Sequence, residues 1–525
     1  MDHSAVRNTA TEAAPSPPQP QTVWDKLRQL DRRHAVWVVM AVAALLYSQS
    51  QFLKQPALGD RANWDYFAQV IARGGVPYRD VVNIKSPLSA YIGAAAIVVT
   101  RPFGVRDIFA IRVTFLWLAA MTVGLTFLVA LECFDNLRLA LLAAVGLLLI
   151  ENFARFNNSG VQPKTPMVLF GLVSLWAMLK DRPFTAGLFG MLSALSWQPG
   201  LLFAGAAGLA ASRYLTSWRD RRALRVIAGA ALPLDVMLIY FGAAGALKDF
   251  YLWNVDFTAT VYAPSEARTL SDFFEHLGKL LNAPYKRSSW LFYAAIAGMA
   301  VAIWQWRRPS PNAQGWLDDA PRHAVLIAAL VYFGFCMTDI QGPVDLLPLL
   351  PFIAIFAAAA MSFALDALSQ LVARGRRQTA RVAIEQWATV VVVAAMFYQA
   401  AAQAKQFEHS AVKLQDQDAA VAEILAQLQP GDQVFTHGVP EILVLGRVTN
   451  ASKYFLLDRN KDAYLDRVEA GGFAGWLERL KAERPKIIAL DRFAYMEHES
   501  DFRAWAAADY EPRITRVFTY YVRKD

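Results

Sequence analysis

Residues 59–88 concentrate side chains that can do chemistry. Three aspartates, several cations and four aromatic residues lie there between two long apolar runs. The segment reads Gly59-Asp60-Arg61-Ala62-Asn63-Trp64-Asp65-Tyr66, then Pro77-Tyr78-Arg79-Asp80, and then Asn83-Ile84-Lys85-Ser86-Pro87-Leu88. A carboxylate can accept a proton from an attacking hydroxyl or amine, and an ammonium can stabilise charge on a departing phosphate. The segment therefore carries the groups that a group-transfer site requires.

The same residues also have a simpler interpretation. Trp and Tyr gather at membrane–water interfaces, and Lys and Arg extend along apolar surfaces toward water. Residues 59–88 could then be an interfacial amphipathic helix with an aromatic belt and no chemistry. Residue types alone leave both interpretations open.

The elements that must position this segment follow from composition. The 525 residues are 55% hydrophobic and 18% charged, whereas soluble chains carry about a quarter charged residues. With only two cysteines, a disulfide scaffold is also excluded. Apolar runs approaching or exceeding the length that crosses a bilayer as a helix predict eleven spans. They are 35–53, 108–131, 138–153, 165–180, 184–197, 199–213, 225–247, 289–306, 323–338, 346–371 and 384–402.

The basic side chains predict how these spans are oriented, because Lys and Arg gather in cytoplasmic loops. The basic clusters alternate correctly if 184–213 is two helices broken at Gln198-Pro199-Gly200 and if the shorter run 87–100 does not cross. The N-terminus is then cytoplasmic, and residues 54–107 and everything after 404 are external. The formal charge of +8 is therefore an orientation signal, and nucleic acid is excluded as a partner.

Three regions follow from these patterns. We expect a disordered cytoplasmic tail at 1–22, a transmembrane domain at 23–404 and a periplasmic α/β domain at 405–525. In the last region, helices are expected at 412–428 and 473–483 and strands at 433–436, 487–490 and 516–522. His437-Gly438 and Gly471-Gly472 are interpreted as turns. The predicted fold class is an all-α polytopic membrane protein, with juxtamembrane helices in 54–107 and a small C-terminal α/β domain.

The order of residues in 59–88 resembles the first external loop of the polyprenyl-phosphate-sugar-dependent membrane glycosyltransferases. These form the C superfamily, and the likeness is to the branch with the protein O-mannosyltransferases and the lipid A aminoarabinose transferase. The resemblance implies a hexosyl- or pentosyltransferase of the bacterial inner membrane. Its donor would be a sugar on a polyprenyl phosphate, and its acceptor an envelope lipid, glycan or protein at the outer face. Membrane lipids would surround it.

The resemblance also implies roles for individual residues. Asp60 stands at the position of the base in an inverting single displacement, and Lys85 at the position of a cation near the lipid phosphate. Tyr78 is expected to line the sugar site. Arg79 and Asp80 are expected to shape the loop by pairing. Asp65 is a further candidate for substrate binding.

The sequence departs from the pattern of this family at several positions. Arg61 replaces a glutamate that many relatives carry, and residues 155–164 lack the acidic residue often found in the next external loop. Gln198 stands where a lysine often follows the fifth span. The candidates for charging the donor pocket are therefore Arg155, Lys164, Lys286 and Arg287, and Gln198 remains a substrate-binding candidate.

These departures leave alternatives open. The donor pocket is arranged differently from that of the relatives, or the activity has been lost. A non-enzymatic transporter or a scaffold for envelope assembly is the competing class, although the internal repeats of transporters are not seen.

We expect no metal and no other cofactor. No two histidines have the spacing of metal ligands, and a divalent cation between Asp60 and Asp65 is disfavoured because residues five apart on a helix diverge by about 140°. Asp235, inside an expected span beside Pro233, is either functional or satisfied by the backbone that the proline frees.

Overall fold

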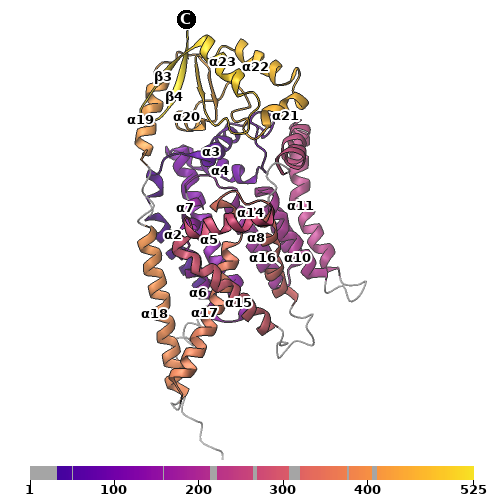
Figure 1. The fold of residues 1–525 in the computed structure, drawn as a ribbon. Coiled ribbons are helices and arrows are strands. Elements are labelled where there is room, and N and C mark those ends of the chain that lie inside the picture. The colour runs from indigo at the N-terminus through magenta and orange to yellow at the C-terminus, as the bar shows by residue number, and fades with distance from the viewer. Residues whose placement is uncertain are drawn as a thin grey trace, which may run out of the picture.

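The computed structural model describes residues 32–49, 51–157, 159–212, 221–263, 269–306, 320–374, 378–404 and 411–524. The tail expected at 1–22 lies outside these residues. The described chain is a bundle of helices with a small sheet region at one end, formed by the C-terminal residues (Figure 1).

Every predicted span corresponds to a helix. The helices are α2 (Arg32–Ser48), α5 (Asp107–Phe134), α6 (Leu137–Leu149), α8 (Lys164–Leu179), α9 (Pro183–Ser196), α10 (Leu201–Ser212), α11 (Arg222–Ala243), α15 (Ser289–Trp306), α16 (Ala320–Thr338), α17 (Leu350–Val372) and α18 (Gln378–Ala404). Among the described residues, five helices are long and apolar enough to cross a membrane, namely those of α5, α11, α15, α17 and α18. The others are shorter, so the count of eleven spans stays a prediction.

Two details of the span pattern are resolved by the structure. The run 184–213 is two helices, because α9 ends at Ser196 and α10 begins at Leu201. The run 138–153 is not one straight helix, since α6 ends at Leu149 and α7 (Glu151–Asn157) follows at a bend of 64°. The bend places the charged Glu151 beside Arg287 instead of within the apolar helix.

The segment 54–107, which is expected to be external, contains two helices. These are α3 (Gly59–Ala72) and α4 (Leu88–Thr100), which pack on each other and on α5. Helix α4 is the apolar run 87–100 that the sequence predicts not to cross.

Helices α9 and α11 cross through a pair of glycines. A Cβ on Gly187 would lie 1.8 Å from the carbonyl oxygen of Val226, and a Cβ on Gly229 would lie 2.0 Å from that of Phe184. Such glycines let two helix backbones approach closely. The crossing matters for the site, because Trp197 ends α9 and the segment after α11 continues through α12 (Leu247–Phe250), η4 (Tyr251–Asp256) and η5 (Thr258–Tyr262).

The C-terminal region is α/β. Its elements are α19 (Leu414–Leu425), β1 (Val434–His437), α20 (Pro440–Gly446), α21 (Lys461–Val468), α22 (Gly472–Ala482), β2 (Ile487–Leu490), α23 (Glu499–Asp509), β3 (Tyr510–Ile514) and β4 (Thr519–Arg523). The strand order is β1-β2-β4-β3, in which β1 and β2 are parallel and the other pairs are antiparallel.

The predicted strands are present as β1, β2 and β4. Strand β4 begins at Thr519, later than expected, because the hydroxyl of Thr515 accepts the amides of Val517 and Phe518 in a turn. Strand β3 was not predicted, since it contains Pro512 and is mostly exposed, as an edge strand allows.

Replacing Gly229 by alanine should destabilise the bundle by about 1–3 kcal/mol, because the new Cβ would force α9 and α11 apart. The thermal midpoint of purified protein in detergent measures this. Gly242→Ala in the same helix is the control, since a Cβ there meets nothing within 4 Å. Equal midpoints for the two variants would contradict the glycine crossing.

The predicted orientation is tested with single cysteines in a background lacking Cys133 and Cys336, which are both buried. Glu478→Cys in α22 and Arg374→Cys after α17 place the thiols at exposed positions. An impermeant maleimide should label the first in intact cells and the second only after permeabilisation. The opposite pattern would invert the topology.

Candidate active site

A cavity of about 480 Å³ lies between the C-terminal region and the helical bundle. Segments far apart in sequence meet there: the start of α3, residues 82–85, the 161–164 loop, residues 339–345 and residues 455–461. Its charged lining residues are Asp60, Arg61, Lys85, Lys164, Asp339, Asp345, Asp458, Arg459 and Lys461. Of the nine residues expected to act on substrate, Asp60, Lys85 and Lys164 line this cavity.

Asp60 lies in the first turn of α3 and is exposed. A carboxylate is stabilised there by the positive end of the helix dipole. Within the described part of the chain, no hydrogen bond or ion pair reaches this carboxylate. It is therefore available to a group that enters the cavity.

Three cations and two aromatic rings alternate along the cavity wall. The ammonium groups of Lys164 and Lys85 lie 4.2 and 5.0 Å from the ring centre of Trp197. Lys85 also lies 4.6 Å from the ring centre of Tyr262, and the guanidinium carbon of Arg459 lies 5.8 Å from it. We call these five residues the cation–aromatic row. Aromatic faces attract cations. The two rings therefore help to stabilise three positive charges that lie close together at the cavity.

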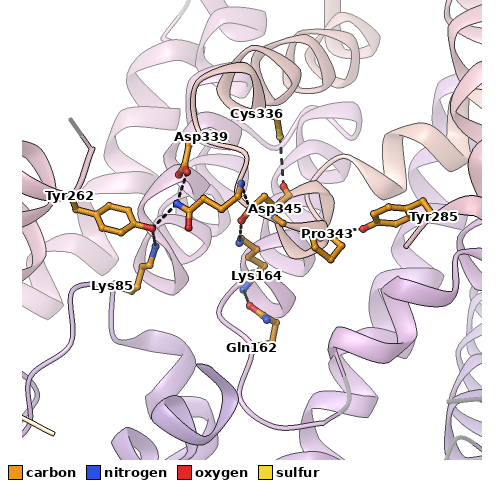
Figure 2. A network of polar contacts seen from close by, with 11 residues as sticks. Lys85, Gln162, Lys164, Tyr262, Tyr285, Cys336, Asp339, Pro343 and Asp345 are labelled. Carbon is orange, nitrogen blue, oxygen red and sulfur yellow. Dashed lines mark hydrogen bonds and ion pairs between the residues drawn. The ribbon is translucent and has the colours of Figure 1, made fainter. Parts of the chain in front are cut away.

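Lys164 is neutralised within the site. Its ammonium lies 2.6 Å from a carboxylate oxygen of Asp345, whose other oxygen accepts the amides of Gln341 and Gly342 (Figure 2). Burial raises the pKa of Asp345, but Lys164 and the two amides outweigh it and hold the pKa below its usual value. Asp345, from the segment 339–345, is therefore the counterion of Lys164.

Tyr262 joins Lys85 to the same network. Its hydroxyl accepts from Lys85 Nζ at 3.4 Å and from Gln341 Nε2 at 3.1 Å, and Gln341 also donates to Asp339 (Figure 2). Burial raises the pKa of Tyr262, but the Lys85 charge and the Gln341 hydrogen bond bring it below the usual value. The Lys85 ammonium is thus held by a long hydrogen bond to Tyr262 and by the ring faces of Trp197 and Tyr262.

The backbone beneath Lys85 is fixed by two residues expected to bind substrate. Tyr78 is fully buried and donates to the Lys85 carbonyl at 2.7 Å, and Gln198 donates to the Ile84 carbonyl at 2.9 Å. Asn83 accepts the amides of Ile84 and Lys85. Tyr78 and Gln198 therefore lie behind the cavity wall and hold Lys85 in place.

Arg79 and Asp80 pair with each other, as predicted. Two nitrogens of the Arg79 guanidinium lie 2.8 Å from the two Asp80 oxygens, and a third donates to the Ala244 carbonyl. Arg79 holds the pKa of Asp80 below its usual value. Asp80 also accepts the Val76 amide, so the pair closes the loop and does not line the cavity.

Asp65 and Arg61 attach α3 to the 159–163 loop. Asp65 is buried and accepts the Val161 amide at 2.8 Å, and Arg61 donates to the Ser159 hydroxyl. Burial raises the pKa of Asp65 to about 6, against that hydrogen bond and nearby arginines. A Cβ on Gly160 would lie 3.0 Å from the Asp65 carboxylate. The 159–163 loop, which has no acidic residue of its own, is therefore held to α3 by side chains of α3.

The remaining candidates lie elsewhere. Arg155 is exposed and, like Lys286, lies outside the cavity lining, whereas Arg287 pairs with Glu151 at 3.4 Å. Asp235 is exposed on α11. The residues that the structure describes contain no group of three or more His, Cys, Asp and Glu side chains arranged to hold a metal ion.

Sequence reasoning missed three members of the cation–aromatic row. Trp197 lies at the end of the apolar run 184–197, where core packing is the usual role of an aromatic residue. Tyr262 lies in the segment between the expected spans 225–247 and 289–306, and Arg459 lies in the C-terminal region. No local motif marks them, because they meet Lys85 only through the fold.

The comparisons with known proteins concern the fold. No protein-family model matches the sequence, and no curated protein shows a sequence match. ArnT from Cupriavidus metallidurans bound to undecaprenyl phosphate matches with a TM-score of 0.62 and 12% identity, over 93% of this chain and 98% of that chain. Its apo state matches with 0.62 and 13% over the same shares. The Archaeoglobus fulgidus oligosaccharyltransferase has a TM-score of 0.48 and 14% identity, over 92% and 73%.

The likeness to ArnT, a lipid A aminoarabinose transferase, shows that this chain has the fold implied by residues 59–88. The resemblance drawn from that segment is therefore confirmed at the level of the fold.

The buried Asp65 predicts an unusual pH dependence of stability. Its pKa is raised from 3.8 to about 6, so the folded state binds the proton more tightly and loses stability as pH rises through that window. Asp65→Asn keeps an acceptor for Val161 but cannot ionise. Relative to wild type, this variant should gain roughly 2 kcal/mol between pH 4.5 and 7.

Unfolding midpoints in detergent at the two pH values measure this gain. Asp80→Asn is the control, because the pKa of Asp80 is lowered and its carboxyl is ionised across the window in both states. A pH-independent difference between Asp65→Asn and wild type would contradict the prediction.

Proposed function

We propose that this protein is a membrane glycosyltransferase. It transfers a sugar from a polyprenyl-phosphate donor to an envelope lipid, glycan or protein at the outer face of the bacterial inner membrane. The observation that carries the proposal is that one cavity holds the cation–aromatic row together with the carboxylate of Asp60, which no hydrogen bond or ion pair from the described residues reaches.

The cation–aromatic row supports recognition of the lipid phosphate. Lys85 is held by a 3.4 Å hydrogen bond to Tyr262 and by two ring faces, contacts that a phosphate oxygen can replace with a stronger charge-assisted bond. The ring of Tyr262, which lines the same cavity and is only half-buried, offers an apolar surface to a sugar. A protein of the same fold, ArnT, has been solved with undecaprenyl phosphate.

Asp60 supplies the base. The acceptor oxygen or nitrogen attacks the anomeric carbon, its proton passes to Asp60, and the bond between that carbon and the phosphate oxygen breaks. The phosphate keeps the electron pair, and Lys85 stabilises its charge. The reaction is a single displacement that inverts the anomeric centre, and the phosphate leaves without an acid.

Lys164 adds to the site a second lysine whose charge is already balanced by a carboxylate. It shares the Trp197 face with Lys85 and is neutralised by Asp345. This arrangement keeps the unliganded cavity close to balanced while leaving Lys85 to receive the donor. It also places a cation beside Trp197, next to the position where Gln198 stands in place of the lysine often found in the relatives.

Asp60→Asn should reduce sugar transfer by about 10²–10⁴-fold, because the amide cannot accept the acceptor's proton. The assay uses purified protein in lipid vesicles, lipid-linked sugars extracted from the host's own membranes, and envelope acceptors. Asp501→Asn, an exposed residue of α23 paired with His498, is the matched control and should transfer at the wild-type rate.

Two outcomes would sink the proposal. One is transfer by Asp60→Asn at the rate of the control. The other is accumulation of substrate inside the vesicles without any glycan product, which would favour a transporter.

A further inference from the structure

One face of α3 is held along its length by the C-terminal region. Four of its residues bond to that region at spacings of three or four, which places them on one side of a helix. They are Gly59, Asn63, Tyr66 and Gln69. At the far end, the Tyr66 hydroxyl accepts the Asn450 amide at 2.9 Å and Gln69 donates to the Val444 carbonyl at 3.0 Å. Figure 1 shows α3 directly beneath α20.

At the near end, beside Asp60, the contact is an ion pair. Glu441 is buried, with 4% of its surface exposed, and lies 2.8 Å from the Arg492 guanidinium. The Glu441 carboxylate also accepts the amide of Gly59. A second guanidinium nitrogen of Arg492 lies 3.5 Å from the Asn63 side-chain oxygen. The pair therefore contacts the residues one before and three after Asp60.

The sheet topology explains why these two residues meet at α3. Strands β1 and β2 are parallel, so their carboxyl ends lie at one edge, where Glu441 and Arg492 follow them. The crossing there is tight, since a Cβ on Gly438 would lie 2.2 Å from the Asp491 carbonyl oxygen. Arg492 itself has a φ of 57°, a conformation uncommon for a residue with a side chain.

We propose that the Glu441–Arg492 pair is a positioning device for Asp60. It fixes the first turn of α3 so that the carboxylate stays directed at the cavity while the rest of the helix is held from behind. This makes the C-terminal region part of the catalytic machinery. The inference rests on the proposed function only through the role of Asp60 as base.

A plain docking role is the competing explanation, and another ion pair provides its control. Arg106 and Asp418 join the same two parts of the chain through contacts of 2.7 and 2.9 Å. Arg106 directly precedes α5 and Asp418 lies on α19, and among the described residues neither forms a hydrogen bond or ion pair with α3. If docking were all that mattered, loss of this pair would be equivalent to loss of Glu441–Arg492.

The experiment compares Arg492→Met, Glu441→Gln, the double variant and Asp418→Asn, all as full-length protein in lipid vesicles. We expect kcat to fall about 10- to 100-fold in the first two, with KM for the lipid donor changed less than about twofold. The double variant should lose no more than the worse single variant, because the two residues act as a unit. Asp418→Asn should retain wild-type kcat.

Amide hydrogen exchange gives a readout that does not depend on activity. Residues 59–63 should exchange at least tenfold faster in Arg492→Met and Glu441→Gln, and at the wild-type rate in Asp418→Asn. Unchanged exchange at 59–63, or losses of kcat equal to those of Asp418→Asn, would overturn the positioning role. If Asp60→Asn itself remained active, the proposed function would fail. Faster exchange at 59–63 would still support the positioning of the helix start.

Discussion

The arrangement depends on how α3 is held. One side of the helix is tied to the 159–163 loop by Asp65 and Arg61, and another is bonded to the C-terminal region through Gly59, Asn63, Tyr66 and Gln69. Its first turn, with Asp60, is left open to the cavity. A helix fixed on two sides has little freedom to turn, so the fold sets the place from which the Asp60 side chain leaves the helix. Preorganisation of this kind is what the proposed displacement reaction would require of Asp60 as its base.

Two of the lysines that line the cavity with Asp60 are already paired with carboxylates. Lys164 is paired with Asp345, and Lys461 with Asp458, so the cavity does not accumulate unsupported positive charge. Lys85 is instead held by aromatic faces and a phenol oxygen, which stabilise a cation without satisfying it as a carboxylate would. The contrast between the paired and the loosely held lysine singles out Lys85 as the group that gains most from an incoming anion.

Apolar runs and a short motif made the helices, the strands β1 and β2, and the pairing of Arg79 with Asp80 predictable, because each depends on neighbours in sequence. The motif also placed Asp60 and Lys85, which the structure brings to one cavity. Trp197, Tyr262 and Arg459 were not predictable, since their meeting depends on the α9–α11 crossing and on docking of the C-terminal region. Tyr78 and Gln198 show the same limit, because sequence gave no sign that they support Lys85 from behind.

The central claim is that this cavity binds a sugar carried on a polyprenyl phosphate through Lys85. Native mass spectrometry of protein released from its own membranes tests it most directly. We expect a polyprenyl-phosphate-linked sugar bound to wild type and to Asp60→Asn, and at least tenfold less of it on Lys85→Met. Absence of any such lipid from wild type, or equal amounts on Lys85→Met, would contradict the account.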